Sequence, residues 1–152
     1  MINPPKEDIE QINVVEYLKI KKIPHFAPIN ENNHSGIIRQ SLISFMGKIK
    51  GLRIANGIIS KLENKSRSMG KSKGFPDLII PRANKYYHGL YIEMKRSRKT
   101  LPSGKKSISH TKISDDQLEW DDKLRDEGYC VVVAYGFKEA VDAIDDYMDN
   151  VE

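Results

Sequence analysis

The segment Gly74-Phe75-Pro76-Asp77-Leu78-Ile79-Ile80, followed by Leu90-Tyr91-Ile92-Glu93-Met94-Lys95, predicts two short apolar strands that carry charged side chains. Asp77 precedes the first strand, and Glu93 and Lys95 lie two residues apart in the second. Residues i and i+2 of a strand face the same side of a sheet, so Glu93 and Lys95 share a face. If the two strands pair as a hairpin, Asp77 reaches that face as well.

Two convergent carboxylates beside a lysine are suited to metal-assisted hydrolysis of a phosphodiester. Carboxylate oxygens are typical ligands of hard divalent cations, and a lysine beside them can polarise a water molecule or a phosphate oxygen. Each signal also has a plainer interpretation. Pro76-Asp77 can simply begin a turn, and Glu93 can form a salt bridge with Lys95 or face outward. Together, with a basic loop on each side, these residues favour a metal-dependent active site.

Glu7 is a candidate third acid at the start of a predicted helix. Gln11, Val14 and Leu18 follow it at i+4, i+7 and i+11, near the same helix face. A glutamate on an inward face could extend the metal shell. The alternative is that Glu7 only complements the helix dipole, which acids in a first turn commonly do.

Gln117 also has two interpretations. It stands three residues after Ser114, which is the spacing of a helix-capping box. It also lies one turn before Trp120 on the inward face of the predicted helix, where it could orient Lys95, a water molecule or a phosphate.

Charge is strongly segregated along the chain of 152 residues, which has a formal net charge of +4. Residues 61–112 contain fourteen Lys or Arg and three acids, two of which are Asp77 and Glu93. Residues 113–152 contain three Lys or Arg and thirteen acids. Such segregation suits a polyanionic partner on the basic side, although lysine-rich segments are often solvated loops. The two embedded carboxylates favour nucleic acid.

The remaining pattern predicts helices around the strands. Apolar spacing predicts one helix over residues 6–20, with a stripe of Ile9, Ile12, Val15 and Leu18, and a second over 38–49 that ends at Gly51. Residues 30–33, 64–74 and 96–112 predict loops. Residues 114–128 predict a helix, 129–135 a strand buried on both faces, and 137–148 a closing helix. The pattern predicts a single α/β domain with a mixed sheet flanked by helices.

Several other classes of protein lack support in the sequence. No run reaches the roughly 18 apolar residues of a membrane span, and the first residues do not resemble a signal peptide. The lone Cys130 cannot form an internal disulfide, which fits a reducing cytoplasm. The four histidines have no zinc-ligand spacing with each other or with Cys130, and there is no phosphate-binding loop of the Gly-x-x-x-x-Gly-Lys-Ser/Thr type.

The motifs resemble those of the VRR-NUC branch of the PD-(D/E)XK nucleases, especially the small stand-alone versions of phages and prophages. The matching segments are Gly74-x-Pro76-Asp77-Leu78, Tyr87-x-Gly89-Leu90-Tyr91-Ile92-Glu93-Met94-Lys95-Arg96, Ser114-x-x-Gln117-x-x-Trp120, Leu124-x-x-x-Gly128-Tyr129 and Gly136-x-x-Glu139-Ala140-x-x-Ala143-Ile144. At the front, Glu7-x-x-x-Gln11 and Ile29-Asn30-Glu31 are similar to the family's opening helix and a following loop. Residues 37–73 match poorly and look like an insertion, and residues 96–112 form an extended basic loop.

The resemblance implies a restriction-endonuclease-like core and a role for each site residue. Asp77 and Glu93 would be metal ligands, with the Met94 carbonyl as a third. Lys95 would orient or deprotonate the attacking water, Glu7 would hold the metal shell or a water, and Gln117 would be the helix glutamine beside the site. The implied cofactor is Mg²⁺, for which Mn²⁺ can substitute.

The resemblance also implies a structure-selective DNA endonuclease that acts on four-way junctions or flaps, as a homodimer, in the cytoplasm of a bacterial or phage-infected cell. The alternatives are a non-catalytic nucleic-acid-binding module on the same fold and a sequence-specific restriction endonuclease. The residues expected to contact the DNA backbone are the basic ones that flank the site: Lys71, Lys73, Arg96, Arg98, Lys99, Lys105 and Lys106.

Overall fold

The computed structural model describes residues 5–28, 31–101, 103–105, 107 and 112–151, without the side chains of residues 31–33. The chain forms two compact units. Residues 1–28 and 74–152 make the first, which we call the core unit, and residues 29–73 make the second, which we call the hairpin unit. None of the described helices is both long enough and apolar enough to cross a membrane.

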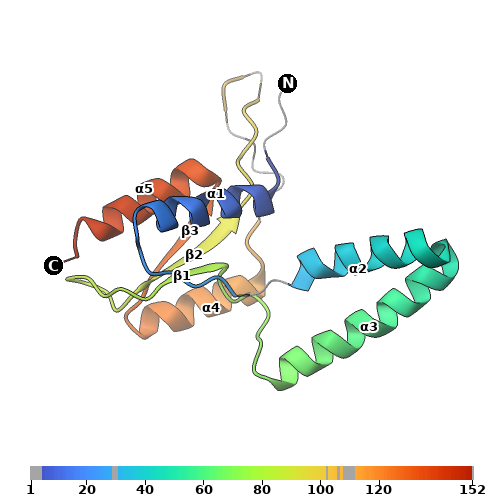
Figure 1. The fold of residues 1–152 in the computed structure, drawn as a ribbon. Coiled ribbons are helices and arrows are strands. Elements are labelled where there is room, and N and C mark those ends of the chain that lie inside the picture. The colour runs from blue at the N-terminus through green and yellow to red at the C-terminus, as the bar shows by residue number, and fades with distance from the viewer. Residues whose placement is uncertain (1–4, 29–30, 102, 106, 108–111, 152) are drawn as a thin grey trace. The chain divides into compact units, whose positions relative to one another are not determined.

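The core unit is a mixed sheet covered by helices on both faces. Its elements in chain order are α1 (Glu7–Ile20), β1 (Leu78–Ile80), β2 (Leu90–Lys95), α4 (Asp115–Asp126), β3 (Cys130–Tyr135) and α5 (Phe137–Met148). β2 lies in the middle, antiparallel to β1 and parallel to β3. Figure 1 shows α1 and α5 over one face and α4 against the other. The predicted α/β class and restriction-endonuclease-like core are confirmed.

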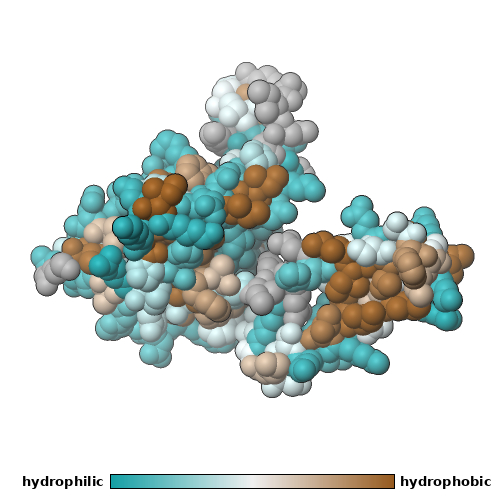
Figure 2. Space-filling view, viewed as in Figure 1, coloured by the Kyte–Doolittle hydropathy of each residue, from teal (hydrophilic) through white to brown (hydrophobic). Residues whose placement is uncertain are grey.

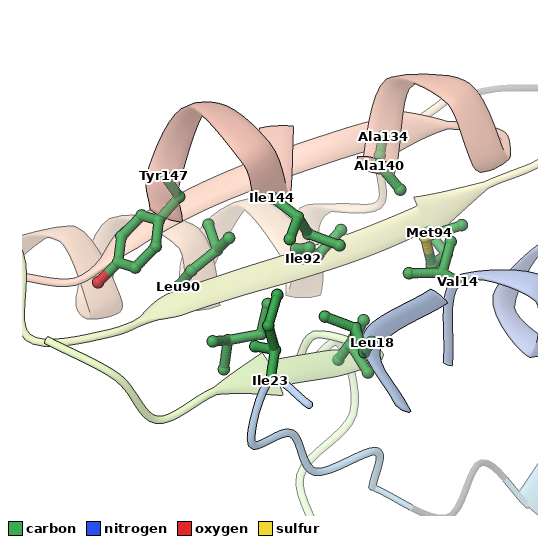
Figure 3. Close-up of a cluster of buried hydrophobic side chains, with 12 residues drawn as sticks. Val14, Leu18, Ile23, Leu90, Ile92, Met94, Ala134, Ala140, Ile144 and Tyr147 are labelled. Carbon is green, nitrogen blue, oxygen red and sulfur yellow. The ribbon is translucent and has the colours of Figure 1, made fainter. Parts of the chain in front are cut away.

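Alternation along β2 separates the apolar core from the charged site. Leu90, Ile92 and Met94 are fully buried and pack with side chains of α1 and α5, as Figure 3 shows. The intervening residues of β2, including Glu93 and Lys95, point to the opposite face, toward α4. The period of two in a strand therefore places the apolar and the charged residues on opposite sides of the same sheet.

The predicted apolar stripe of α1 was right for Leu18 and for Val15, which packs against the core, and wrong for the other two residues. Ile9 and Ile12 are 47% and 60% exposed, whereas Glu10, Val14 and Leu18 are buried. These three residues follow an i, i+4, i+8 spacing, which keeps them on one helix face. The helix is weakly amphipathic, so its apolar residues alone did not identify the inward side.

The expectation that β3 is buried on both faces was also wrong. Only Val131 and Ala134 of this strand are buried, and its other residues are half-buried. β3 stands at the edge of the described sheet and pairs there with β2 alone, so its side chains have strand neighbours on one side only and are less fully covered.

The hairpin unit consists of two helices, α2 (Glu31–Met46) and α3 (Lys48–Ser68), joined at Gly47. The expected helix end at Gly51 was wrong, as were the loops expected at residues 31–33 and 64–68, because both segments are helical. A β-carbon on Gly51 would lie 2.6 Å from the Leu42 carbonyl oxygen. Gly51 therefore lets the two helices approach closely and does not end a helix.

Candidate active site

Asp77 lies beside the carboxyl half of β2. Leu78 pairs with Ile92, so continuing the antiparallel register by one residue brings Asp77 opposite Glu93. Asp77 Oδ2 accepts a hydrogen bond of 2.9 Å from the Met94 backbone N–H. The hairpin geometry expected for the two strands is thus present, and Asp77 is more than the start of a turn.

Glu93, Lys95 and Gln117 form a hydrogen-bonded group between the sheet and α4. Lys95 Nζ lies 2.8 Å from Glu93 Oε1 and 3.2 Å from Gln117 Oε1. Gln117 Nε2 donates a hydrogen bond to the same Glu93 oxygen. The side chains of Glu93 and Lys95 are only 5% and 12% exposed. The salt bridge between Glu93 and Lys95 therefore exists, but it is buried and shared with a third residue from another element.

The start of α4 fixes the position of Gln117. Ser114 Oγ accepts from the Gln117 backbone N–H, and Gln117 Oε1 accepts from the Ser114 backbone N–H at 2.9 Å, which completes a capping box. Gly74 lets this helix start approach the strand, because a β-carbon there would lie 2.5 Å from the Asp116 backbone. Gly74 also has a φ of 81°, which favours glycine. The capping box is therefore confirmed, and Gln117 also contacts Lys95, while a role toward water or phosphate remains a prediction.

Glu7 joins the site from α1. Its residue surface is exposed, but the partial burial of its carboxyl raises its pKa, and the charge of Asp77 adds to that increase. Lys95 and a hydrogen bond from the Arg96 backbone act in the opposite direction. These interactions place the Glu7 carboxyl close to the other charged groups of the site.

Glu93 is the most electrostatically perturbed of these acids. Burial raises the pKa of its carboxyl to about 7, and the charge of Asp77 adds to the increase. The hydrogen bond and charge of Lys95 oppose it. Three carboxyl groups, those of Glu7, Asp77 and Glu93, thus act on one another beside a single lysine, and carboxylate oxygens are the ligands that hard divalent cations take.

The donor chemistry of the site fits Mg²⁺ or Mn²⁺. Asp77 and Glu93 supply hard carboxylate oxygens, the Met94 carbonyl lies on the same strand, and Glu7 adds a third carboxyl nearby. Within the described ranges, no three His, Cys, Asp or Glu side chains already converge as a metal cluster. Glu93 Oε1 is instead held by Lys95 and Gln117. The metal-ligand roles remain predictions.

Sequence reasoning missed two buried acids, Glu10 and Asp121, and quoted Gln11 in the opening-helix motif without giving it a role. Glu10 is buried and accepts hydrogen bonds from Ser97 Oγ at 2.6 Å and from the Phe137 backbone N–H at 2.8 Å. It thereby links α1 to the segment after β2 and to the start of α5. The i, i+4, i+8 spacing of Glu10 with the buried residues of α1 was the signal that could have revealed it.

Gln11 contacts the backbone of Asp77, and Asp121 lies within the electrostatic influence of Lys95. Gln11 Nε2 donates to the Asp77 carbonyl oxygen at 3.1 Å. Asp121 is a buried acid one turn after Gln117 on α4, and burial raises its pKa while the charges of Arg125 and Lys95 lower it. No local sequence signal marked Asp121, because α4 is rich in acids on all sides.

The residues predicted to contact DNA differ in their exposure and in the contacts of their side chains. Arg96 Nε donates to the Pro5 carbonyl oxygen at 2.9 Å, and the Arg98 guanidinium lies 3.6 Å from the centre of the Tyr135 ring. Lys71, Lys73, Lys99 and Lys105 are exposed. Lys106 lies outside the described residues, and Lys71 and Lys73 belong to the hairpin unit. Contact of these residues with DNA remains a prediction.

A mixed sheet that presents an acid, a Glu-x-Lys pair and a helix glutamine at one place defines the restriction-endonuclease-like class. The VRR-NUC domain model matches residues 46–138, and the chain belongs to this family, which is of nuclease type. The match includes α3, and the expected insertion at 37–73 remains a prediction. A solved structure described as "VRR_NUC domain protein" has 23% sequence identity and a TM-score of 0.67, over 99% of this chain and 94% of that one. No curated protein matches the chain.

Proposed function

We propose that this protein is a Mg²⁺-dependent endonuclease that hydrolyses DNA phosphodiester bonds, with branched DNA as its substrate. The observation that carries the proposal is the convergence of Asp77, just before β1, with Glu93 and Lys95 of β2 and Gln117 of α4, within a family of nuclease type. Each residue has a chemical role that this reaction needs.

Asp77, Glu93 and the Met94 carbonyl are the proposed ligands, and Glu7 holds the outer shell of the site. The bound cation supplies Lewis-acid stabilisation of the charge that develops on the phosphate. Lys95 orients the attacking water, and its ammonium donates hydrogen bonds to the negative charge that develops on the phosphate. Gln117 holds the Lys95 ammonium and the Glu93 carboxylate in one geometry. Water adds to phosphorus while the bond to one bridging oxygen breaks, and the proton that the water loses passes through solvent to the leaving oxygen.

The proposal also includes branched DNA as the substrate and a homodimer as the active form. Both are supported by the resemblance of the motifs to small stand-alone nucleases of this type. DNA as the polyanion is supported by the fourteen Lys or Arg residues of segment 61–112, in which Asp77 and Glu93 are embedded.

A digestion panel tests the function. Linear, flapped and four-way DNA of matched sequence are incubated with the protein in EDTA, Mg²⁺, Mn²⁺ and Ca²⁺. We expect cleavage of the branched forms in Mg²⁺ and Mn²⁺, and binding with little turnover in Ca²⁺, whose looser geometry holds the water less well. Binding without cleavage in any metal would support the non-catalytic module. Cleavage of linear DNA at one sequence would support the restriction enzyme.

A further inference from the structure

The turn between α2 and α3 presents the two most exposed large apolar side chains of the described residues. Phe45 is 86% exposed and Ile49 is 88% exposed. They lie on either side of the Gly47 turn, and Met46 between them is also exposed. We call residues 45–50 the hairpin tip. Single exposed apolar residues are ordinary, but several gathered at one turn indicate a binding surface.

The charge of the hairpin tip selects the kind of partner. Lys48 and Lys50 are both exposed and stand on either side of Ile49 in the sequence. No Asp or Glu occurs from residue 32 to residue 62, although that stretch contains five Lys or Arg. Apolar side chains surrounded by cations, without any acid nearby in the sequence, complement a polyanion that also offers apolar faces. Nucleic acid has both, in its phosphates and its bases.

We propose that the hairpin tip inserts Phe45 and Ile49 against unstacked bases of branched DNA while Lys48 and Lys50 contact the neighbouring phosphates. DNA-binding proteins use Phe, Ile, Leu and Met as wedges between base steps, and aromatic rings stack on bases of any sequence. At a branch point the continuous stacking of the duplex is already interrupted, so insertion there separates fewer stacked bases. The proposal rests on the proposed function and assigns a substrate-selecting role to the hairpin unit.

A second copy of the chain is a less suitable partner for this surface. The hairpin unit, residues 29–73, contains nine Lys or Arg and two acids. Contact between the hairpins of two copies would therefore bring like charges together, which opposes association. Figure 2 shows that apolar side chains continue along the helices of the hairpin unit beyond its tip, and at the tip a lysine stands on each side of Ile49 in the sequence.

The test measures DNA binding in EDTA, so that it does not depend on cleavage. A four-way junction carries 2-aminopurine at its branch point, and a linear duplex carries it at the same sequence position. The wild type should raise the fluorescence of the junction probe as the base unstacks, with little change for the duplex. The double variant Phe45→Ser, Ile49→Ser should lose this rise and bind the junction about tenfold more weakly, with unchanged helix content by circular dichroism.

The matched control is Ile20→Ser, Phe26→Ser, which removes an exposed Ile and an exposed Phe from the core unit, where they are 78% and 61% exposed. It should behave as the wild type. A second variant, Lys48→Gln, Lys50→Gln, should flatten the salt dependence of binding by up to about 2 log–log units.

Two results would overturn the proposal. The first is that the tip variant binds the junction as tightly as the control variant does and raises the probe fluorescence by the same amount. The second is that, without DNA, the wild type sediments as a dimer and the tip variant as a monomer. The tip would then contact a second copy of the chain. If the wild type unstacks the probe but cleaves no DNA in Mg²⁺ or Mn²⁺, the tip assignment stands and the nuclease function fails.

Discussion

At the residue scale, the side-chain amide of Gln117 connects a helix start to the proposed chemistry. Its carbonyl accepts hydrogen bonds from the Ser114 backbone and from Lys95, and its NH₂ group donates to Glu93. A residue that caps a helix is fixed in rotamer by that role. The same constraint holds the Glu93–Lys95 pair in place, so local stability and site geometry depend on one group.

The first prediction is that Asp77→Ala, Glu93→Ala and Lys95→Ala each reduce DNA cleavage by about 10²-fold or more. Each removes a group that contacts the cation, the water or the phosphate in the proposed reaction. Lys95→Ala should retain most DNA binding, measured by fluorescence anisotropy in Ca²⁺. The exposed pair of Asp142 with Lys138 on α5 offers a control, and Asp142→Asn should cleave normally. Parental cleavage by Lys95→Ala would show that the assignment is wrong.

The second prediction concerns the pH dependence of stability without metal. The pKa of Glu93 is raised from 4.5 to about 7 in the folded protein, mainly by burial. The fold therefore favours the protonated form, and this contribution is fully present below pH 4.5 and is lost as the pH rises to about 7. Urea unfolding in EDTA should show a loss on the order of 1–3 kcal/mol across this window.

The comparison variant for the pH experiment is Glu93→Gln, which cannot ionise. Its stability should change less than that of the wild type between pH 4.5 and 7, because other groups titrate equally in both proteins. Mg²⁺ should restore stability to the wild type at pH 7 and leave the variant unaffected. Parallel pH profiles for the two proteins would contradict the raised pKa of Glu93.

At the scale of elements, two substitutions at the start of α4 distinguish an effect on folding stability from an effect on cleavage. Ser114→Ala removes the side-chain acceptor for the Gln117 N–H and should cost about 1 kcal/mol of folding stability. The Ser114 backbone N–H still bonds Gln117 Oε1, so cleavage by the folded protein should change little. Gln117→Ala removes the contacts with Glu93 and Lys95 and should reduce cleavage about 10- to 100-fold, since hydrogen bonds to charged groups are involved.

The measurement for this third prediction is the cleavage rate at a temperature where both variants are fully folded, with the folded fraction checked by thermal unfolding. A fall in Ser114→Ala as steep as that in Gln117→Ala would mean that Gln117 acts only through the helix cap.

In the α2–α3 hairpin, helix propensity alone predicted the wrong helix end. Glycine is unfavourable inside a helix, so Gly51 predicted a helix end. The close approach of α2 to α3 at this position requires a residue without a side chain. Gly51→Ala should therefore destabilise the hairpin unit, although alanine has the higher helix propensity, and the break at Gly47 should be unaffected.

At the scale of the whole molecule, segregated charge predicts how DNA binding depends on salt. The basic segment 61–112 should contact phosphates and release counterions, so affinity should fall with a log–log slope of about −0.9 per contact on duplex DNA. Lys105→Gln together with Lys106→Gln should flatten that slope by up to about 2 units and weaken binding to unrelated sequences equally.

Titration of DNA binding between low and moderate salt checks this fourth prediction. A loss confined to one DNA sequence would favour base-specific recognition by this loop. An unchanged slope would mean that the loop faces away from the DNA. The control is Glu119→Gln, which removes a charge from the acidic segment 113–152. It should leave the log–log slope of affinity against salt unchanged.

The sequence by itself determined the strands, the Asp77 and Glu-x-Lys pattern and the capping box of α4. These features depend on neighbours within a few residues, because strand alternation and helix capping are local rules. The range of β2 and that of α5 were predicted correctly for the same reason.

Only the tertiary structure decided which face of α1 is buried, that α3 continues through Gly51, and that Glu10 joins α1 to Ser97 and Phe137. It also decided that Gln117 reaches both Glu93 and Lys95. Each of these depends on a contact between segments far apart in the chain. The free energy of such contacts comes from burial and pairing across elements, so residue type and spacing within one segment indicate which side chains face inward but not the partners they meet there.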